Sequence, residues 1–415
     1  MLTIRKYHTD SLSWGDSPIW SSGKLVLNKQ TLIDTSLGDL KNYELDFEIA
    51  QPGDNTRIIH ITDAVRPAKK AGGISAFPGW TAGENQAGRG ITFQLENVVV
   101  MQTCRFADIQ EGIVDMSGAG ARYSAFSKMI NLVMTVTPLG THVDKKELAQ
   151  DLKMMILRAA EYTASLAAEQ KGYAEENYEL SPMSQEKGPR VGYTCFIQAQ
   201  GPLRNVHICG EDCVAMKPRI LAPEAILDGA LVSGNYIIAC QKNPTIFHQE
   251  NPIIKGLFER DKLALSFGGV IVSTESSSLE GKKENARLIA RLARELKLDG
   301  ILVTQEGGGH ADVDLMMTLD ECEKSGVKTV ILTNEIAGPQ GDMPPLVSYS
   351  DRADAIITNG NNDEIVSLDS AGHVIGGSDI LNGKFSAADG FKTSLGILYT
   401  STNQLGFNSM KTVVY

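Results

Sequence analysis

Four short apolar segments in the last third of the chain constrain its fold more than any other feature. Helix-length segments separate them, and the apolar segments are FGGVIVS (267–273), GILVT (300–304), KTVILT (328–333) and ADAIIT (353–358). Apolar strands that alternate with amphipathic helices form parallel sheets whose two faces are covered by helices. We therefore predict an α/β protein with a Rossmann-like parallel sheet in its C-terminal part.

Two helices can be assigned from capping patterns and apolar periodicity. Ser277 and Glu280 resemble a capping box at the start of a helix between the first two apolar segments. A longer helix is predicted from Asp144 to about Lys171, because leucine, methionine and alanine recur there at helical spacing. Gly172 is the residue expected to end it.

The first part of the chain has a different pattern. Up to about Cys104, short strand-like runs such as KLVLN and ENVVVMQTC are broken by Gly, Pro, Asn and Asp. We predict a β-rich, mixed α+β N-terminal region at residues 1–143 and a mixed α/β region at 144–239. The Rossmann-like domain follows at 240–415, and its first residue is a cysteine discussed below.

Polar side chains stand at the carboxyl ends of the four predicted parallel strands. They belong to Glu275, the segment 305–307 (QEG), the pair 334–335 (NE) and the segment 359–361 (NGN). Ligands of parallel α/β sheets bind beyond the carboxyl ends of the strands, so these groups could converge on one crevice for a small polar or cationic molecule. Helix capping and loop solvation are the commoner roles of such residues.

Composition excludes several classes of protein. The chain has 415 residues and a formal net charge of -11 without long Lys/Arg clusters, which argues against nucleic acid as a partner. The N-terminus lacks the apolar stretch of a signal peptide, and no apolar run approaches the roughly 20 residues that cross a bilayer. The six cysteines form no CxxC pair, which fits a reducing compartment. We expect a cytoplasmic protein without membrane insertion.

The glycine-rich segment QEGGGHADVD (305–314) contains residue types found in metal sites and in anion sites. His310, Asp312 and Asp314 carry possible metal ligands, but alternate spacing in a loop is a weak signal. The three glycines could hold an anion on backbone N–H groups, although a tight strand-to-helix turn needs glycine as well. Because no GxGxxG or Walker pattern is present, we predict neither a metal nor a nucleotide.

Cys240, within NYIIACQKNP (235–244), stands after an apolar run and before a turn. It could simply be a small buried hydrophobe. Alternatively, its thiolate could attack the carbonyl of the small residue Ala239 and shift the chain from amide to thioester. Elimination would then leave dehydroalanine, which hydrolyses to an N-terminal pyruvoyl group, and the turn 241–244 could hold the strain that this shift needs.

Several longer segments resemble one enzyme family, the component B proprotein of glycine, sarcosine and betaine reductases, with D-proline reductase as a more distant relative. The resemblance covers most of the chain. The segments that carry it are FPG (77–79), QEGIVDMSGAGARYSAFSK (110–128), PRVGYTCFIQAQG (189–201), LDGALVSGNYIIACQKNPTIFHQENPII (227–254), LDGILVTQEGGGHADVDLMM (298–317), KTVILTNEIAG (328–338) and ADAIITNGN (353–361).

The resemblance implies a function and a cofactor. Cys240 matches the pyruvoyl precursor, so cleavage would give fragments 1–239 and 240–415, and the pyruvoyl carbonyl would form a Schiff base with the substrate amine. An oxidoreductase subunit for reductive C–N cleavage is implied, in an oligomeric assembly. The implied partners are a selenocysteine-containing component B subunit and a carrier selenoprotein, component A.

The remaining site residues are predicted from position. Glu306 is expected to act with Cys240, and Glu275, Glu335 and Asn243 are expected to line the pocket, because they lie at strand ends or near Cys240 in sequence. Trp80 lies where the sequence departs from the glycine-type pattern. An indole face attracts methylated ammonium groups by about 0.5–2 kcal/mol, so Trp80 could belong to a cage for an N-methylated amine, or it could be a core residue.

Two alternatives share this resemblance. The quaternary nitrogen of betaine has no N–H and cannot condense with a carbonyl, so a betaine-type chain could keep Cys240 intact and serve as a non-catalytic substrate-binding or scaffold subunit. A D-proline-reductase-like enzyme would use the same pyruvoyl group to open a cyclic amine. The sequence leaves the choice of amine open.

Overall fold

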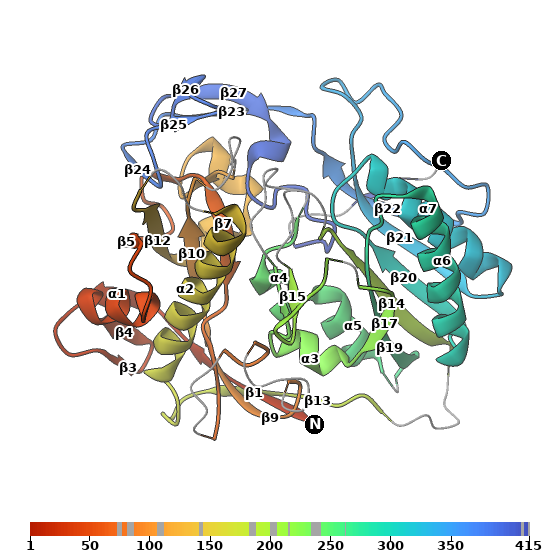
Figure 1. The fold of residues 1–415 in the computed structure, drawn as a ribbon, viewed down its shortest axis with the longest axis horizontal. Coiled ribbons are helices and arrows are strands. Elements are labelled where there is room, and N and C mark those ends of the chain that lie inside the picture. Colours follow the sequence, from red (N-terminus) through yellow and green to blue (C-terminus); the bar gives the residue numbers. More distant parts are fainter. Residues whose placement is uncertain are drawn as a thin grey trace.

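A seven-stranded sheet organises the C-terminal part of the computed structural model (Figure 1). The structure describes residues 1–72, 77–80, 87–105, 112–140, 144–181, 188–199, 206–214, 216–233, 242–261, 263–407 and 411–413. In spatial order, the strands are β17 (Arg219–Leu221), β19 (Ser266–Thr274), β14 (Arg190–Ile197), β20 (Gly300–Thr304), β21 (Lys328–Glu335), β22 (Ala355–Asn361) and β28 (Lys411–Val413). The five middle strands are parallel and the two outer ones antiparallel. The α/β class and the largely parallel sheet are confirmed.

Helices cover both faces of this sheet. On one face, α6 (Leu279–Glu295) and α7 (His310–Lys324) pack through residues such as Ile289 and Leu315 against Ile271 and Val303. On the other face, α5 (Pro252–Arg260) contributes Ile254 and Leu257 to a core shared with β14 and β19. Figure 1 shows α6 and α7 side by side at the outer face of the sheet.

The predicted helix ends are partly wrong. The N-cap of α6 is Ser278, one residue after the predicted Ser277, and it accepts a hydrogen bond from the backbone of Gly281. The long helix α2 (Lys145–Ser165) is capped by Asp144 as predicted but ends six residues before Lys171. Beyond Ser165, successive backbone bonds span three residues and Glu169 takes a left-handed conformation (φ 67°), so the helix unwinds before Gly172 is reached.

Two four-stranded mixed sheets form the N-terminal part of the molecule. One has the order β13 (Ala174–Tyr178), β1 (Leu2–His8), β9 (Gly90–Glu96), β8 (Ala68–Lys70), and the other β5 (Tyr43–Ala50), β12 (Ile130–Pro138), β10 (Val98–Thr103), β7 (Ile61–Val65). Helix α2 packs its apolar face, including Leu152 and Ile156, into the core that these sheets share, and α1 (Lys29–Leu37) lies beside it. The strand-rich pattern of the first part of the sequence has this origin.

Smaller elements connect and extend these layers. The three-stranded sheets are β2 (Ser11–Trp14), β4 (Lys24–Leu27), β3 (Ile19–Ser21); β11 (Val114–Asp115), β6 (Thr56–Ile58), β24 (His373–Ile375); and β16 (Glu211–Asp212), β15 (His207–Ile208), β18 (Leu231–Val232). Two further sheets have two antiparallel strands each: β23 (Ile365–Leu368) with β27 (Phe391–Ser394), and β25 (Asp379–Ile380) with β26 (Phe385–Ser386). Short helices are α3 (Pro223–Leu227), α4 (Thr245–Gln249) and the 3₁₀ turns η1 (Ala119–Tyr123), η2 (Ala125–Lys128) and η4 (Leu395–Ile397). Within the described ranges, no helix has the length and apolar character that crossing a bilayer requires.

Segments before and after residue 240 share the same sheet and core. The central strand β14 precedes that residue, whereas its neighbours β19 and β20 follow it. Arg57 adds a second connection: its buried guanidinium binds the Asp115 carboxylate at 2.6 and 2.9 Å and donates to the carbonyls of Asp369, Ala387 and Asp389 at 2.7–2.9 Å. A cut near residue 240 would therefore divide the chain but not the packed structure. The three-region division and the Rossmann-like description stay predictions.

A buried ionic cluster joins the end of α4 to the N-terminal sheets. The Glu250 carboxylate lies 3.4 Å from Arg66 Nε and 3.6 Å from Lys6 Nζ, and it also contacts Lys255. Burial alone would raise the pKa of Glu250, but the charges of Arg66, Lys255 and Lys6 outweigh it and lower the pKa to about 2. The folded state therefore favours the ionised carboxylate.

We expect Glu250→Gln to lower the free energy of unfolding at pH 7 by roughly 3 kcal/mol, because three cations lose their shared anion. The pKa is depressed on folding, so this contribution is present above about pH 4.5 and is lost as the pH falls towards about 2. Urea unfolding at a series of pH values checks this. The exposed Glu44→Gln should show no such pH-dependent difference, and equal curves for both variants would contradict the prediction.

Candidate functional site

The carboxyl ends of the five parallel strands carry a set of buried polar side chains at one edge of the sheet. Most of them were predicted from the sequence. The members are the half-buried Gln198 after β14 and the buried Glu275 after β19, Gln305 and Glu306 after β20, Asn334 and Glu335 at the end of β21, and Asn359 in β22. This set is referred to below as the strand-end crevice. Because the strands are parallel, all of these residues lie at the same edge of the sheet.

Glu306 connects three parts of the chain within the crevice. Its Oε1 accepts a hydrogen bond from the backbone N–H of Asn243 at 2.9 Å, and its Oε2 accepts one from the backbone N–H of Gln198, also at 2.9 Å. His248 Nε2, on α4, lies 3.5 Å from Oε1. The glutamate side chain is 1% exposed. The structure thus places Glu306 and Asn243, both predicted from the sequence, in direct contact.

A polar segment near the C-terminus completes this part of the site, and the sequence prediction missed it. Asn403 donates through its side-chain amide to Asn243 Oδ1, and its backbone carbonyl accepts from Asn359. Thr402 donates to Asn362. The run TSTNQ (400–404) is buried although it is entirely polar. A polar run following the apolar segment GILY was the available signal, because hydroxyl and amide side chains are buried only where they find partners.

Two buried lysines flank residues 234–241, a range that includes Cys240 and lies outside the described residues. Lys242 Nζ donates to the carbonyl of Gln198 at 3.0 Å, and Lys153 Nζ, on α2, donates to the carbonyl of Ser233 at 2.8 Å. Burial lowers the pKa of Lys242 to about 8, against the attraction of Glu306. Burial also lowers the pKa of Lys153 to about 7, against the attraction of Asp63.

Sequence reasoning did not identify Lys153 or Asp63. Lys153 interrupts the apolar face of α2 between Leu152 and Met155, and a lysine on a buried helix face is an available signal for a partnered or functional group. Asp63 lies in the fully buried strand β7. Its importance follows from contacts with residues about 180 positions later in the chain, which no local pattern shows.

Glu275 is a predicted site residue that is buried without hydrogen bonds to its side chain from the described part of the chain. Its side chain is 5% exposed, and neither carboxyl oxygen has a hydrogen-bond partner among the residues that the structure describes. Burial, together with the charges of Asp314 and Glu306, raises its pKa well above the usual value. Among the described residues, the buried amide oxygens of Gln198, Gln305, Asn334 and Asn359 also have no partner. A set with this many unused acceptors suits a ligand that donates hydrogen bonds or carries positive charge.

The other two predicted binding residues have different surroundings. Glu335 is buried at the end of β21 and accepts a hydrogen bond from Thr358 on the neighbouring strand, which places it in the strand-end crevice. Trp80 packs against the N-terminal core, with its ring centroid 4.7 Å from that of His207 on β15. His207 pairs with Val232, one residue before Ser233. Trp80 is therefore close to the start of the segment that contains Cys240 and not part of the strand-end set.

The glycine-rich segment is occupied by structural contacts. Gly307 has φ 80°, and a Cβ at that position would lie 3.1 Å from the Gln198 side chain, so glycine is required there. Asp312 binds Gln305 at 2.7 Å and the Val347 backbone at 2.9 Å, while Asp314 binds Lys282. Among the described residues, no three His, Cys, Asp or Glu side chains are grouped as metal ligands.

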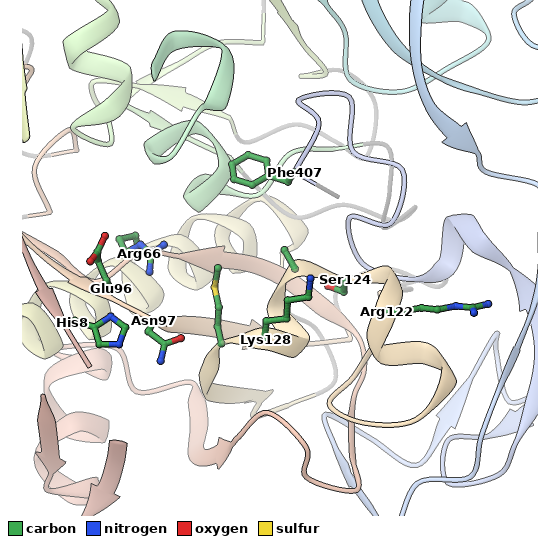
Figure 2. Close-up of a pocket in the computed structure, with 10 residues that line it drawn as sticks. His8, Arg66, Glu96, Asn97, Arg122, Ser124, Lys128 and Phe407 are labelled. Carbon is green, nitrogen blue, oxygen red and sulfur yellow. The ribbon is translucent and has the colours of Figure 1, made fainter. Parts of the chain in front are cut away.

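An open groove of about 560 Å³ is lined by residues of the N-terminal part and by Phe407 (Figure 2). Figure 2 shows Lys128 and Ser124 between Arg66 and Arg122 along its wall, with Phe407 opposite. A second groove of about 450 Å³ shares Arg66 and Phe407 and extends along α4 and α5. Neither groove is lined by residues of the strand-end crevice.

Comparison with known proteins identifies the family. Residues 1–413 match the family described as glycine/sarcosine/betaine reductase component B subunits. The chain is 34% identical over 432 residues to "Glycine reductase complex component B subunits alpha and beta" of Acetoanaerobium sticklandii, and 33% identical over 431 residues to the protein of that name from Peptoclostridium acidaminophilum. It is 31% identical over 428 residues to "Sarcosine reductase complex component B subunit alpha" of Peptoclostridium acidaminophilum. Each alignment covers 100% of both chains.

The chain therefore belongs to the glycine/sarcosine/betaine reductase component B family, which confirms the resemblance found in the sequence. No solved structure matches it. The arrangement of the strand-end crevice is thus described from this chain alone.

We expect Glu275→Met to raise the free energy of unfolding by about 1–3 kcal/mol, because it removes a buried carboxyl group without partners at similar volume. The raised pKa means that the folded protein holds a proton that the unfolded chain releases above about pH 4.5. The stability that Glu275 costs should therefore grow as the pH rises above that value. Urea unfolding between pH 4 and 8 tests this, and a variant less stable than the parent throughout would contradict it.

Proposed function

We propose that this chain is the substrate-binding component B subunit of a glycine/sarcosine/betaine-type reductase, and that it holds a small amine for reductive cleavage of its carbon–nitrogen bond. The strand-end crevice is the observation that carries the proposal. It offers buried, unpartnered acceptors, including both oxygens of Glu275, to a cationic nitrogen. The relatives are named as components of glycine and sarcosine reductase complexes, which supports the same reaction class.

We further propose that Cys240 is converted to a pyruvoyl group. The Cys240 thiolate would add to the Ala239 carbonyl as the peptide C–N bond breaks and its nitrogen takes a proton. Loss of the α-proton with cleavage of the Cβ–S bond would leave dehydroalanine on the second fragment and a thiocarboxylate on Ala239. Hydrolysis of the dehydroalanine would form the pyruvoyl group and release ammonia, and hydrolysis of the thiocarboxylate would release hydrogen sulfide. This sequence needs no external oxidant. Two relatives carry the name "subunits alpha and beta" for a single aligned chain, which supports such a division.

Residues close to Cys240 in the sequence, together with residues of the strand-end crevice, suit a pyruvoyl group. When present, the carbonyl would draw electrons from the carbon–nitrogen bond of the bound amine. Glu275, whose pKa is raised well above the usual value, would give up its proton as the ammonium form binds. Lys242, whose pKa is lowered to about 8, would take the proton that an ammonium must lose before its nitrogen can react. Glu306 would hold Asn243 and the start of α4 in place through the Asn243 N–H.

The reducing nucleophile is proposed to come from partner proteins. Burial raises the pKa of Cys104, Cys213 and Cys322 to about 12 and that of Cys195 further, so these thiols stay protonated near neutral pH. The chain contains no selenocysteine. A selenocysteine-containing component B subunit and the carrier selenoprotein, component A, would supply the selenolate and accept the carbon fragment.

We expect the purified chain to separate into fragments 1–239 and 240–415 on a denaturing gel, with a hydrazide probe labelling only the second fragment. Intact mass locates the cut. The hydrazide identifies the pyruvoyl group, because only a carbonyl reacts with it. Cys240→Ala should give one unlabelled band, whereas Cys213→Ala, which changes another thiol, should still be cleaved. An uncut, unlabelled chain in a complex that still breaks carbon–nitrogen bonds would instead favour the substrate-binding or scaffold role.

The identity of the amine is open to a direct binding test in which Trp80 is the variable. If Trp80 contributes to a cage, calorimetric affinity should increase from glycine to sarcosine to betaine, and Trp80→Ala should lower betaine affinity by roughly two- to thirtyfold, the size of a cation–π contact. Trp14→Ala, at an exposed tryptophan, is the control. A flat series that Trp80→Ala does not change would remove the cage, and turnover of D-proline would indicate the cyclic-amine alternative.

A further inference from the structure

The two ends of the segment that contains Cys240 are tied to one another. Ser233 is the last described residue before the segment, and its backbone N–H donates to Thr245 Oγ1 at 2.9 Å. Thr245 is the first residue of α4. Both residues are buried, at 1% and 0% exposure, so water does not compete for this bond. The described residues on the two sides of this segment are therefore in direct contact.

Two ionisable side chains from the N-terminal part bind Ser233 and Thr245. Asp63, on β7, accepts the Thr245 backbone N–H at 2.9 Å and the Thr245 hydroxyl at 2.7 Å. Because the single hydroxyl hydrogen goes to Asp63, the Thr245 oxygen is left to accept from Ser233. Lys153, on α2, donates to the Ser233 carbonyl at 2.8 Å. Asp63, Lys153, Ser233 and Thr245 are called the clasp below.

A helix cap alone does not account for the clasp. Asp63 does serve as a remote N-cap for α4, which has no side-chain cap of its own. However, Gln249 already anchors α4 to β7, since its amide exchanges hydrogen bonds with the backbone of Arg66 at 3.0 and 3.3 Å. A cap also needs neither the Ser233–Thr245 bond nor Lys153. The Thr245 hydroxyl and the Lys153 ammonium group both bind the backbone of Ser233, the residue before the segment.

We infer that the clasp positions both flanks of the Ala239–Cys240 bond for chain cleavage and keeps the new ends together afterwards. The inference rests on the proposed function. Ser233 would belong to the first fragment and Thr245 to the second, so the bond between them would cross the cut. On the far side, Asn243 is held by Glu306, which directs the second fragment towards the strand-end crevice. Asp63, Lys153 and Thr245 are thus positioning residues.

Thr245→Val tests the inference, because valine keeps the shape of threonine and removes the hydroxyl. We expect cleavage of the newly made full-length chain, followed by pulse labelling and denaturing gel, to slow at least tenfold. Thr245→Ser restores the hydroxyl and should cleave within about twofold of the parent. Thr318→Val is the matched control: Thr318 is also buried, but its hydroxyl has no partner, so cleavage should be unchanged.

Hydrogen exchange supplies a readout that does not require any variant to fold. The amides of Ser233, Asn243 and Thr245 should exchange slowly in the parent protein, since each is buried and bonded. Fast exchange at Ser233 would overturn the clasp. So would a Thr245→Val chain that is cleaved at the parental rate while the parent is cleaved normally, and the proposed function would then stand. A parent chain that is never cleaved would overturn both the clasp and the proposed conversion of Cys240, and the substrate-binding role would remain.

Discussion

The buried carboxylate of Glu306 is the interaction on which the site depends. Removing a carboxylate from water is costly, and the cost is offset only when the group is fully hydrogen-bonded. Here the two oxygens accept backbone N–H groups from Gln198 and Asn243, which lie at the end of β14 and just before α4. One side chain therefore sets the spacing between the sheet edge and the chain that follows Cys240. Loss of either bond would leave a buried charge short of a partner.

Segments on both sides of residue 240 supply side chains of the strand-end crevice. Gln198 comes from the strand before residue 240, whereas Glu275, Glu306, Asn334 and Asn359 come from strands after it. The Arg57 contacts and the pairing of β6 with β24 hold the outer parts of the two halves together. Chain cleavage in such a structure changes covalent connectivity without separating the groups that form the site.

The sequence predicted what local patterns can encode. The strands of the parallel sheet were found because buried strands are continuous apolar runs, and Glu275, Glu306 and Glu335 followed from the rule that ligands bind at strand ends. Asp63 and Lys153 were not found, because their roles come from contacts with Thr245 and Ser233 across about 180 and 80 positions. The end of α2 was misplaced because three-residue backbone bonds and a left-handed Glu169 ended the helix before the glycine.

The electrostatics of the crevice bear on which amine it suits. Its acceptors would bind any cationic nitrogen, but a base is useful only for a nitrogen that carries a proton. Lys242 has its pKa lowered to about 8 and lies close enough to Glu275 for their charges to interact, so it can exchange a proton near neutral pH. Burying a lysine costs desolvation free energy, and a quaternary amine carries no proton that this lysine could accept. Under the proposed function, the arrangement of Lys242 and Glu275 would therefore suit a primary or secondary amine. The aromatic contact of Trp80 lies elsewhere, against His207.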